Sequence, residues 1–133
     1  MTVETVVPLR WGDMDAMRHV NNATYLSYFE TAREPWFERM LVGDDPMRWV
    51  LRRIEVDFRS QLTFADGAVR VTVALDGIGT SSVRTAERIT AESDGRLVAE
   101  ARTVIVRLDE SGLRSEPIPD GLRESLVGAA AAT

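Results

Sequence analysis

One long helical segment in a chain otherwise built of strand-like segments is the feature that most constrains the fold. From Asn21 onward the apolar residues recur at three- and four-residue spacings, which places them on one stripe of a helix. The stripe consists of Tyr25, Phe29, Ala32, Trp36 and Met40. Asn21 or Asn22 is the expected N-cap, and Gly43 is the expected stop. Because Pro35 removes one helical hydrogen bond, we expect a kink near residues 31–34 or a break with Pro35 opening a second short helix.

The rest of the chain has the period of two that is typical of strands with one buried face. Strands are predicted over residues 3–9, 48–58 and 69–75, and over two further runs joined by a turn at 93–96. The segment VRVTVAL, residues 69–75, is flat and apolar, and we expect it to pair with another chain as part of a dimer formed through edge strands. A short helix is predicted near 122–127, and the tail over 128–133 is expected to fray.

This order of segments predicts an α+β fold in which one long helix packs against one face of a five-stranded antiparallel sheet. The 133 residues suit a single domain spanning 1–133. A composition of 44% hydrophobic and 28% charged residues excludes a disordered chain. No apolar run is long enough to span a membrane and no signal-peptide pattern opens the chain, so a cytoplasmic location is expected. The net charge of −5 disfavours nucleic acid as a partner.

Several kinds of catalytic chemistry are disfavoured by the residues present. The chain has no cysteine, which removes thiolate nucleophiles and cysteine-based metal sites. His19 is the only histidine and no G-x-S-x-G motif appears, which disfavours a serine triad. A metal site built on Asp13, Asp15 and His19 lacks a second histidine, so no metal is expected. The G-x-G of Gly77 and Gly79 lies between strand-like runs, so the dinucleotide-binding interpretation fails on context.

Carboxylate chemistry at the start of the helix remains. Asp15 lies just ahead of the helix, where the dipole and the free amides favour negative charge on a carboxylate or on a substrate oxygen. Such a carboxylate can attack an activated carbonyl to give a mixed anhydride, or it can deprotonate an attacking water. A backbone N–H near Asn22 could polarise that carbonyl and so stabilise the transition state by about 3 kcal/mol. Spacing alone leaves capping and catalysis equally open for Asp15, whereas Asp13 is best interpreted as a capping carboxylate.

The stretch DMDAMRHVNNATYLSYFETAR, residues 13–33, resembles the motif D-x-D-x-x-G-H-V-N-N-x-x-Y-L-x-x-F-E-x-A-R of hotdog-fold acyl-CoA thioesterases of the 4-hydroxybenzoyl-CoA thioesterase type. A looser similarity continues through the later strands and covers nearly the whole chain. The resemblance implies a hotdog fold, in which a curved sheet wraps the helix and two subunits share a continuous sheet with active sites at their interface. Such dimers often pair into tetramers. It also implies hydrolysis of an acyl-CoA thioester to free acid and coenzyme A, without a cofactor.

Carried over by position, the resemblance makes Asp15 the nucleophile or general base and the Asn22 backbone N–H the group that holds the thioester carbonyl. His19 is a third catalytic candidate, although a purely hydrogen-bonding histidine is its simpler interpretation. The substrate-binding candidates are Asn21, Tyr25, Arg59, Ser60, Thr80, Ser81 and Ser82. The arginines considered for the nucleotide phosphates are Arg84, Arg88 and Arg107. Glu30 and Arg33, three residues apart on the helix, are interpreted as a solvated pair.

One position departs from the family motif. Arg18 stands where the family has glycine, so the arginine must either adopt an ordinary backbone conformation or strain the turn. Two alternative functions stay open. One is a non-catalytic acyl-CoA binding or sensing module, which Arg18 supports best, and the other is a hotdog hydratase or dehydratase. The identity of the acyl group also stays open, because the apolar residues could line either a tunnel for an aliphatic chain or a pocket for an aryl group. The residues considered for lining it are Trp11, Met14, Met17, Trp36 and Trp49.

Overall fold

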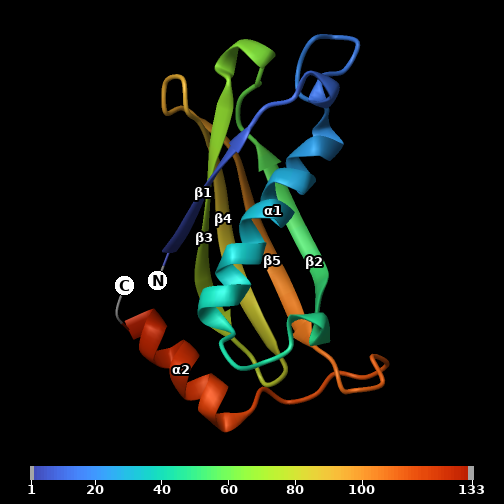
Figure 1. The fold of residues 1–133 in the computed structure, drawn as a ribbon, viewed down its shortest axis with the longest axis vertical. Helices are drawn as coiled ribbons and strands as arrows, with labels where there is room; N and C mark the ends of the chain where they lie inside the picture. The colour runs from blue at the N-terminus through green and yellow to red at the C-terminus, as the bar shows by residue number, and fades with distance from the viewer. Residues whose placement is uncertain (1, 132–133) are drawn as a thin grey trace.

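A curved antiparallel sheet with one long helix along its concave face forms the body of the molecule, shown in Figure 1 as a computed structural model that describes residues 2–131. The strands and helices are β1 (Thr2–Pro8), α1 (Asn22–Met40), β2 (Trp49–Phe58), β3 (Ala68–Ile78), β4 (Ser82–Ala91), β5 (Leu97–Arg107) and α2 (Asp120–Ala131). Short 3-10 turns lie at Trp11–Asp13, Pro46–Arg48 and Phe64–Asp66. The predicted α+β class and the order of its elements are confirmed.

The five strands lie in the order β1-β3-β4-β5-β2, and every neighbouring pair is antiparallel. The edges of the sheet are therefore β1 and β2. The expectation that residues 69–75 offer a free strand for pairing is wrong, because β3 lies between β1 and β4, with Val3 opposite Val73. Alternation shows that a strand has a buried face, but it carries no information about which strand returns to cover its edge.

The predicted helical stripe is confirmed, since all five of its members are at most 3% exposed and pack against the inward valines of β3 and β4. The predicted break at Pro35 is wrong, because α1 runs without interruption from Asn22 to Met40. Burial of Ala32 and Trp36 on either side of Pro35 holds the helix together despite the missing hydrogen bond. The helix ends three residues before Gly43, which adopts a positive φ of 85°.

The interpretation of Arg33 as a solvated residue is also wrong. Its guanidinium is buried and donates to Glu87 of β4 at 2.8 Å. Thr85 donates to the other oxygen of Glu87 at 2.7 Å, and its hydroxyl also contacts that of Thr103 on β5. Burial raises the pKa of Glu87, while Arg33 and the Thr85 hydroxyl act in the opposite direction. Local sequence spacing does not predict this ion pair, because Arg33 and Glu87 lie 54 residues apart in the sequence.

The C-terminal helix α2 extends beyond the predicted segment in both directions and includes residues 128–131, which were expected to fray. Residues 132 and 133 of that tail lie outside the described residues. Leu122 and Leu126 are buried, and α2 packs against α1 and β3. Among residues 2–131, neither helix has the length and apolar character that crossing a membrane requires.

Candidate active site

Asp13 anchors the loop that leads into α1. Its buried carboxylate accepts hydrogen bonds from the Tyr28 hydroxyl at 2.8 Å and the Arg10 N–H at 2.9 Å, and its carbonyl accepts from the Asn21 N–H at 2.9 Å. Burial alone would raise the pKa of Asp13, but the hydrogen bonds from Arg10 and Tyr28 outweigh it and lower the pKa. Burial and the neighbouring Asp13 raise the pKa of Tyr28. The predicted structural role of Asp13 is therefore confirmed.

Asp15 lies two residues further along, on an exposed turn that closes on itself. The Asp15 N–H donates to the His19 carbonyl at 2.8 Å, and the Arg18 N–H donates to the Asp15 carbonyl at 3.0 Å. The carboxylate oxygen Oδ1 accepts from the backbone N–H of Met17 at 2.8 Å and of His19 at 3.3 Å. The other oxygen, Oδ2, has no hydrogen-bond partner within residues 2–131. The turn thus fixes the orientation of the carboxylate and leaves one oxygen available to attack or to take a proton.

Arg18 completes this turn with a φ of 63°, and among residues 2–131 no other non-glycine residue has a positive φ. The left-handed conformation costs an L-residue about 1 kcal/mol or more, whereas glycine adopts it freely. Of the two expectations for this position, the strained turn is the one observed. The backbone therefore keeps the shape that the family glycine would allow, at the expense of local strain.

The first turn of α1 exposes a free amide. Asn21 is the N-cap, as predicted, and its side chain accepts from the Ala23 N–H at 2.9 Å while its carbonyl accepts from the Thr24 N–H at 2.9 Å. The intervening Asn22 N–H donates to no acceptor in the described part of the chain. An unpaired N–H at the positive end of a 19-residue helix is suited to hold a carbonyl oxygen as negative charge develops on it.

A groove of about 510 Å³ runs beside Asp15. It is lined by Trp11, Met14, Asp15, Arg18, Thr63, Phe64 and Ala65. The rings of Trp11 and Phe64 meet edge to face with centroids 5.6 Å apart, and they remain 74% and 45% exposed. Two accessible aromatic rings next to a carboxylate form a surface that suits an apolar group attached to a reactive carbonyl.

Comparison with known proteins relates this geometry to a family. Residues 9–126 match the model of the thioesterase-like superfamily. The chain belongs to that superfamily. It is 27% identical over 132 residues to the long-chain acyl-CoA thioesterase FadM of Escherichia coli, an alignment that covers 93% of this chain and 96% of that protein.

Solved structures agree with this assignment. A thioesterase from Thermus thermophilus, determined with coenzyme A and zinc, is 34% identical with a TM-score of 0.85, and the match covers 97% of this chain and 94% of that one. A predicted thioesterase from Bacillus stearothermophilus is 30% identical with a TM-score of 0.85 and 96% coverage of both chains. The expected hotdog fold is confirmed, and the protein is a thioester hydrolase.

Other predicted site residues of this family member lie near the Asp15 end of the sheet. His19 is half-buried on the Asp15 turn. Tyr25 is only 2% exposed and meets Phe58 edge to face with ring centroids 5.3 Å apart, so it supports the site from the core. Burial raises the pKa of its hydroxyl. Ser60 donates to the Leu97 carbonyl at 2.8 Å, and Arg59 pairs with Glu100 at 3.2 Å. Both residues are thus engaged in contacts that shape the loop after β2.

Thr80, Ser81 and Ser82 lie at the opposite end of the molecule (Figure 1). The eleven residues of β3 separate this turn from the Asp15 end, which at about 3.3 Å per residue is roughly 35 Å. The carbonyls of this turn accept hydrogen bonds from the N–H groups of Ile118 and Arg107, which holds it against the C-terminal segment. Within one chain, this segment and Asp15 therefore cannot contact the same thioester group.

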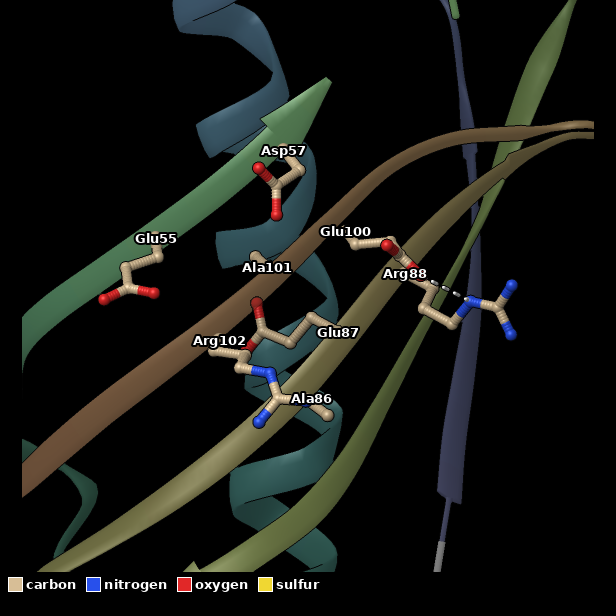
Figure 2. A pocket seen from close by; sticks show the side chains of 8 residues that line it. All are labelled: Glu55, Asp57, Ala86, Glu87, Arg88, Glu100, Ala101 and Arg102. Carbon is tan, nitrogen blue, oxygen red and sulfur yellow. Dashed lines mark ion pairs between the residues drawn. The ribbon is translucent and has the colours of Figure 1, made fainter. Parts of the chain in front are cut away.

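The three arginines considered for phosphates lie elsewhere. Arg107 is buried and bound to Asp44 at 2.9 Å and to Glu116 at 2.6 Å. Arg84 lies over Gly77 of β3. A Cβ atom added to Gly77 would come within 2.1 Å of the Arg84 guanidinium. Arg88 pairs with Glu100 at 3.8 Å on the sheet face opposite α1, beside a pocket of about 230 Å³ (Figure 2). The carboxylates around that pocket, among them Glu55 and Asp57, disfavour a phosphate there.

Only some of the apolar residues considered for lining the acyl site lie in this groove. Trp11 and Met14 line it, whereas Met17 is 75% exposed outside it. Trp36 is fully buried, and Trp49 is buried with its indole N–H donating to Asp44 at 2.7 Å. Sequence reasoning missed Thr63, Phe64 and Ala65, which carry no local signal and reach the groove only because the loop after β2 folds over Trp11. Within residues 2–131, no three histidine, aspartate or glutamate side chains are grouped so as to hold a metal ion.

Proposed function

We propose that this protein hydrolyses acyl-CoA thioesters, with Asp15 as nucleophile or general base and the Asn22 N–H as the oxyanion donor. The observation that carries the proposal is that the N-terminal end of α1 presents both a carboxylate with one unbonded oxygen, which lines an apolar groove, and an unpaired amide in the first turn of the helix. The names of FadM and of the coenzyme A-bound thioesterase support acyl-CoA as the substrate class.

The chemistry follows from where charge develops. The thioester carbonyl oxygen accepts the Asn22 N–H, which stabilises the negative charge that forms when the carbonyl carbon is attacked. In one route Asp15 attacks, the C–S bond breaks, the thiolate leaves and is protonated, and water hydrolyses the mixed anhydride. In the other, Asp15 takes a proton from water as that water attacks, and the departing thiolate receives the proton. Either route consumes only water, and we propose that neither a metal nor a redox cofactor takes part.

A dimer would complete this site. β2 is an edge strand, and its apolar residues Val50, Leu51 and Phe58 are 41% to 50% exposed. Antiparallel pairing of β2 with the same strand of a second copy would continue the sheet and cover these side chains. Because the paired strands point in opposite directions, the 80–82 turn of one copy would approach the Asp15 end of the other. This arrangement gives Thr80, Ser81 and Ser82 a part in substrate binding. A pairing of such dimers into a tetramer and a cytoplasmic location remain predictions.

Complementation tests the shared site directly. Asp15→Asn in one preparation and Thr80→Ala/Ser81→Ala/Ser82→Ala in another each disable one half of it. After unfolding and refolding the two together, hybrid dimers contain one intact site, and we expect about a quarter of wild-type activity. Each variant refolded alone is the control. No recovery in a mixture shown by mass spectrometry to contain hybrids would contradict the shared site. Light scattering should give twice the 14.8 kDa chain mass for a dimer, or four times that mass if two dimers pair.

The activity itself is tested by thiol release from a panel of aliphatic and aryl CoA thioesters. Binding without thiol release would support the non-catalytic sensing module, whose best argument is the strained turn at Arg18. Hydration of an enoyl-CoA without thioester cleavage would instead support a hydratase. Release of thiol that is abolished by Asp15→Asn supports the proposal.

A further inference from the structure

We propose that Arg18 is a specificity-determining residue that binds an anionic oxygen group of the substrate, either a carboxylate on the acyl chain or a phosphate of the coenzyme. The inference rests on the proposed thioesterase function and concerns which thioesters the site prefers. It starts from the one residue of the Asp15 turn that departs from the family motif and pays for that departure in backbone strain.

The backbone argues that the Arg18 side chain has a use. At a φ of 63° glycine would satisfy the turn without strain, and the turn forms nonetheless with arginine. Its shape is kept by backbone hydrogen bonds that any residue except proline could make at position 18, since the Arg18 N–H donates to the Asp15 carbonyl and the Asp15 carboxylate accepts from the His19 N–H. Nothing in these contacts requires a guanidinium. Strain that is tolerated at a functional site, and not required by the fold, indicates a role for the side chain.

The position argues that this use involves the substrate. Arg18 lines the same groove as Asp15, Trp11 and Phe64. Its guanidinium forms no ion pair with residues 2–131, whereas Arg10 next to the same loop pairs with Asp13 at 3.2 Å. Other exposed arginines also lack partners, but Arg18 alone combines an unpaired charge, a strained backbone and a place beside the attacking carboxylate. A guanidinium presents a planar set of donors that matches a carboxylate or a phosphate.

Electrostatics supply the reason for a cation here. The chain carries a net charge of −5, and Asp15 adds a negative charge inside the groove itself. An acyl carboxylate or a coenzyme phosphate that reaches this groove would be repelled by both. Arg18, three residues from Asp15 on the same turn, offsets that repulsion at the place where the anion would lie. With glycine at this position the groove would favour neutral acyl groups.

Four thioesters separate the two sources of the anion. Hexanoyl-CoA carries phosphates only, adipoyl-CoA carries phosphates and an acyl carboxylate, adipoyl-pantetheine carries the carboxylate only, and hexanoyl-pantetheine carries neither. The variants are Arg18→Gln, which removes the charge, and Arg18→Lys, which keeps it. Arg39→Gln is the control for net charge, because Arg39 is exposed in the last turn of α1, at the other end of that helix from the groove, and has no side-chain bond to residues 2–131. Steady-state kcat/KM and KM are measured for each pair.

If Arg18 binds the acyl carboxylate, Arg18→Gln lowers kcat/KM about tenfold or more for both adipoyl thioesters and leaves both hexanoyl thioesters unchanged. If it binds a phosphate, the loss appears with both CoA thioesters and with neither pantetheine thioester. In either case Arg18→Lys retains part of the preference, and the effect lies mainly in KM.

Two results would overturn the proposal. One is an unchanged kcat/KM for all four substrates in Arg18→Gln. The other is an equal loss that includes hexanoyl-pantetheine, which would mean that the substitution disturbs the turn or the oligomer and not the recognition of an anion. Both differ from a failure of the proposed function, which would appear as thioester cleavage that survives Asp15→Asn.

Discussion

The two ends of α1 contrast in how completely their polar groups are paired. At the C-terminal end, Asp44 accepts from Trp49 at 2.7 Å and from Arg107 at 2.9 and 3.0 Å, and Arg107 also binds Glu116. At the N-terminal end, one oxygen of Asp15 and the Asn22 N–H have no partner within residues 2–131. Groups that are fully paired stabilise a fold, whereas oriented but unpaired groups can act on a ligand. The contrast predicts that substitutions at the two ends will separate activity from stability.

The largest effect is expected for Asp15→Asn. The amide oxygen can still accept from the Met17 and His19 N–H groups, so the turn should persist. The amide can neither attack nor take a proton efficiently, and kcat should fall about 10²–10⁴-fold. Thiol release measures the activity, and thermal unfolding is expected to show a melting temperature close to that of the wild type. A variant that keeps near-native turnover would remove Asp15 from the mechanism.

The opposite outcome is expected for Asp44→Ala. This change leaves the buried Arg107 guanidinium and the Trp49 indole N–H without their main acceptor. Loss of a partner from a buried ion pair should cost about 2–4 kcal/mol of unfolding free energy, measured by urea denaturation. The kcat of the folded fraction should stay unchanged. Glu38→Ala, an exposed site near the same end of α1, is the control and should shift stability by less than about 0.5 kcal/mol.

The contribution of Asp44 should also depend on pH. Hydrogen bonds from Arg107 are the main cause that lowers the pKa of Asp44 below its ordinary value of 3.8, with burial opposing them. A lowered folded-state pKa means that the stabilisation is fully present above the unfolded pKa and is lost as the pH falls through the folded pKa. The free-energy difference between wild type and Asp44→Asn should therefore be constant from pH 5 to 7 and shrink below pH 4. A difference that does not change down to pH 3 would contradict ionic pairing at this end.

Local features of the fold could be predicted from the sequence, whereas long-range contacts could not. The α1 stripe, the Asn21 cap and the strand alternation follow from the spacing of neighbouring residues, and the structure confirms them. The Arg33–Glu87 pair and the covering of β3 by β1 depend on segments that meet only after folding. Burial of a charged side chain gives no periodic signal when its partner lies on another element.

The candidate site divides in the same way. The motif around Asp15 and Asn22 supplied the chemistry, because both residues lie within a few positions of the helix start. Phe64 lines the groove through the fold of a separate loop, and its own neighbours in sequence give no indication of this. Thr80, Ser81 and Ser82 lie about one strand length from Asp15 in a single chain, so their role depends on a second copy. Local pattern therefore gives no sign of Phe64, whereas Thr80, Ser81 and Ser82 are candidates only through the family resemblance.

A smaller effect, on both properties together, is expected for Tyr28→Phe. The Tyr28 hydroxyl donates to the buried Asp13 carboxylate, which in turn links the Asp15 loop to α1. Its removal leaves one buried carboxylate lone pair unsatisfied and should cost about 1–2 kcal/mol. Because the Asp13 carbonyl also holds the Asn21 N–H, kcat should fall severalfold while KM changes little. Unchanged kcat with reduced stability would show that the loop does not depend on this anchor.

The smallest effect is expected for Arg18→Gly, and its sign is opposite to the others. Glycine removes the strain of the left-handed conformation, worth about 1–2 kcal/mol, but adds roughly 0.5–1 kcal/mol of chain entropy to the unfolded state. The net gain, at most about 1.5 kcal/mol, should raise the melting temperature by a few degrees. Arg18→Ala is the matched control, because alanine keeps the unfavourable φ of 63° and should give no increase. Equal melting temperatures for Arg18→Gly and Arg18→Ala would mean that the backbone at position 18 is not strained in either variant. The N-terminal end of α1 would then hold the unpaired Asp15 oxygen and Asn22 N–H without a cost in stability.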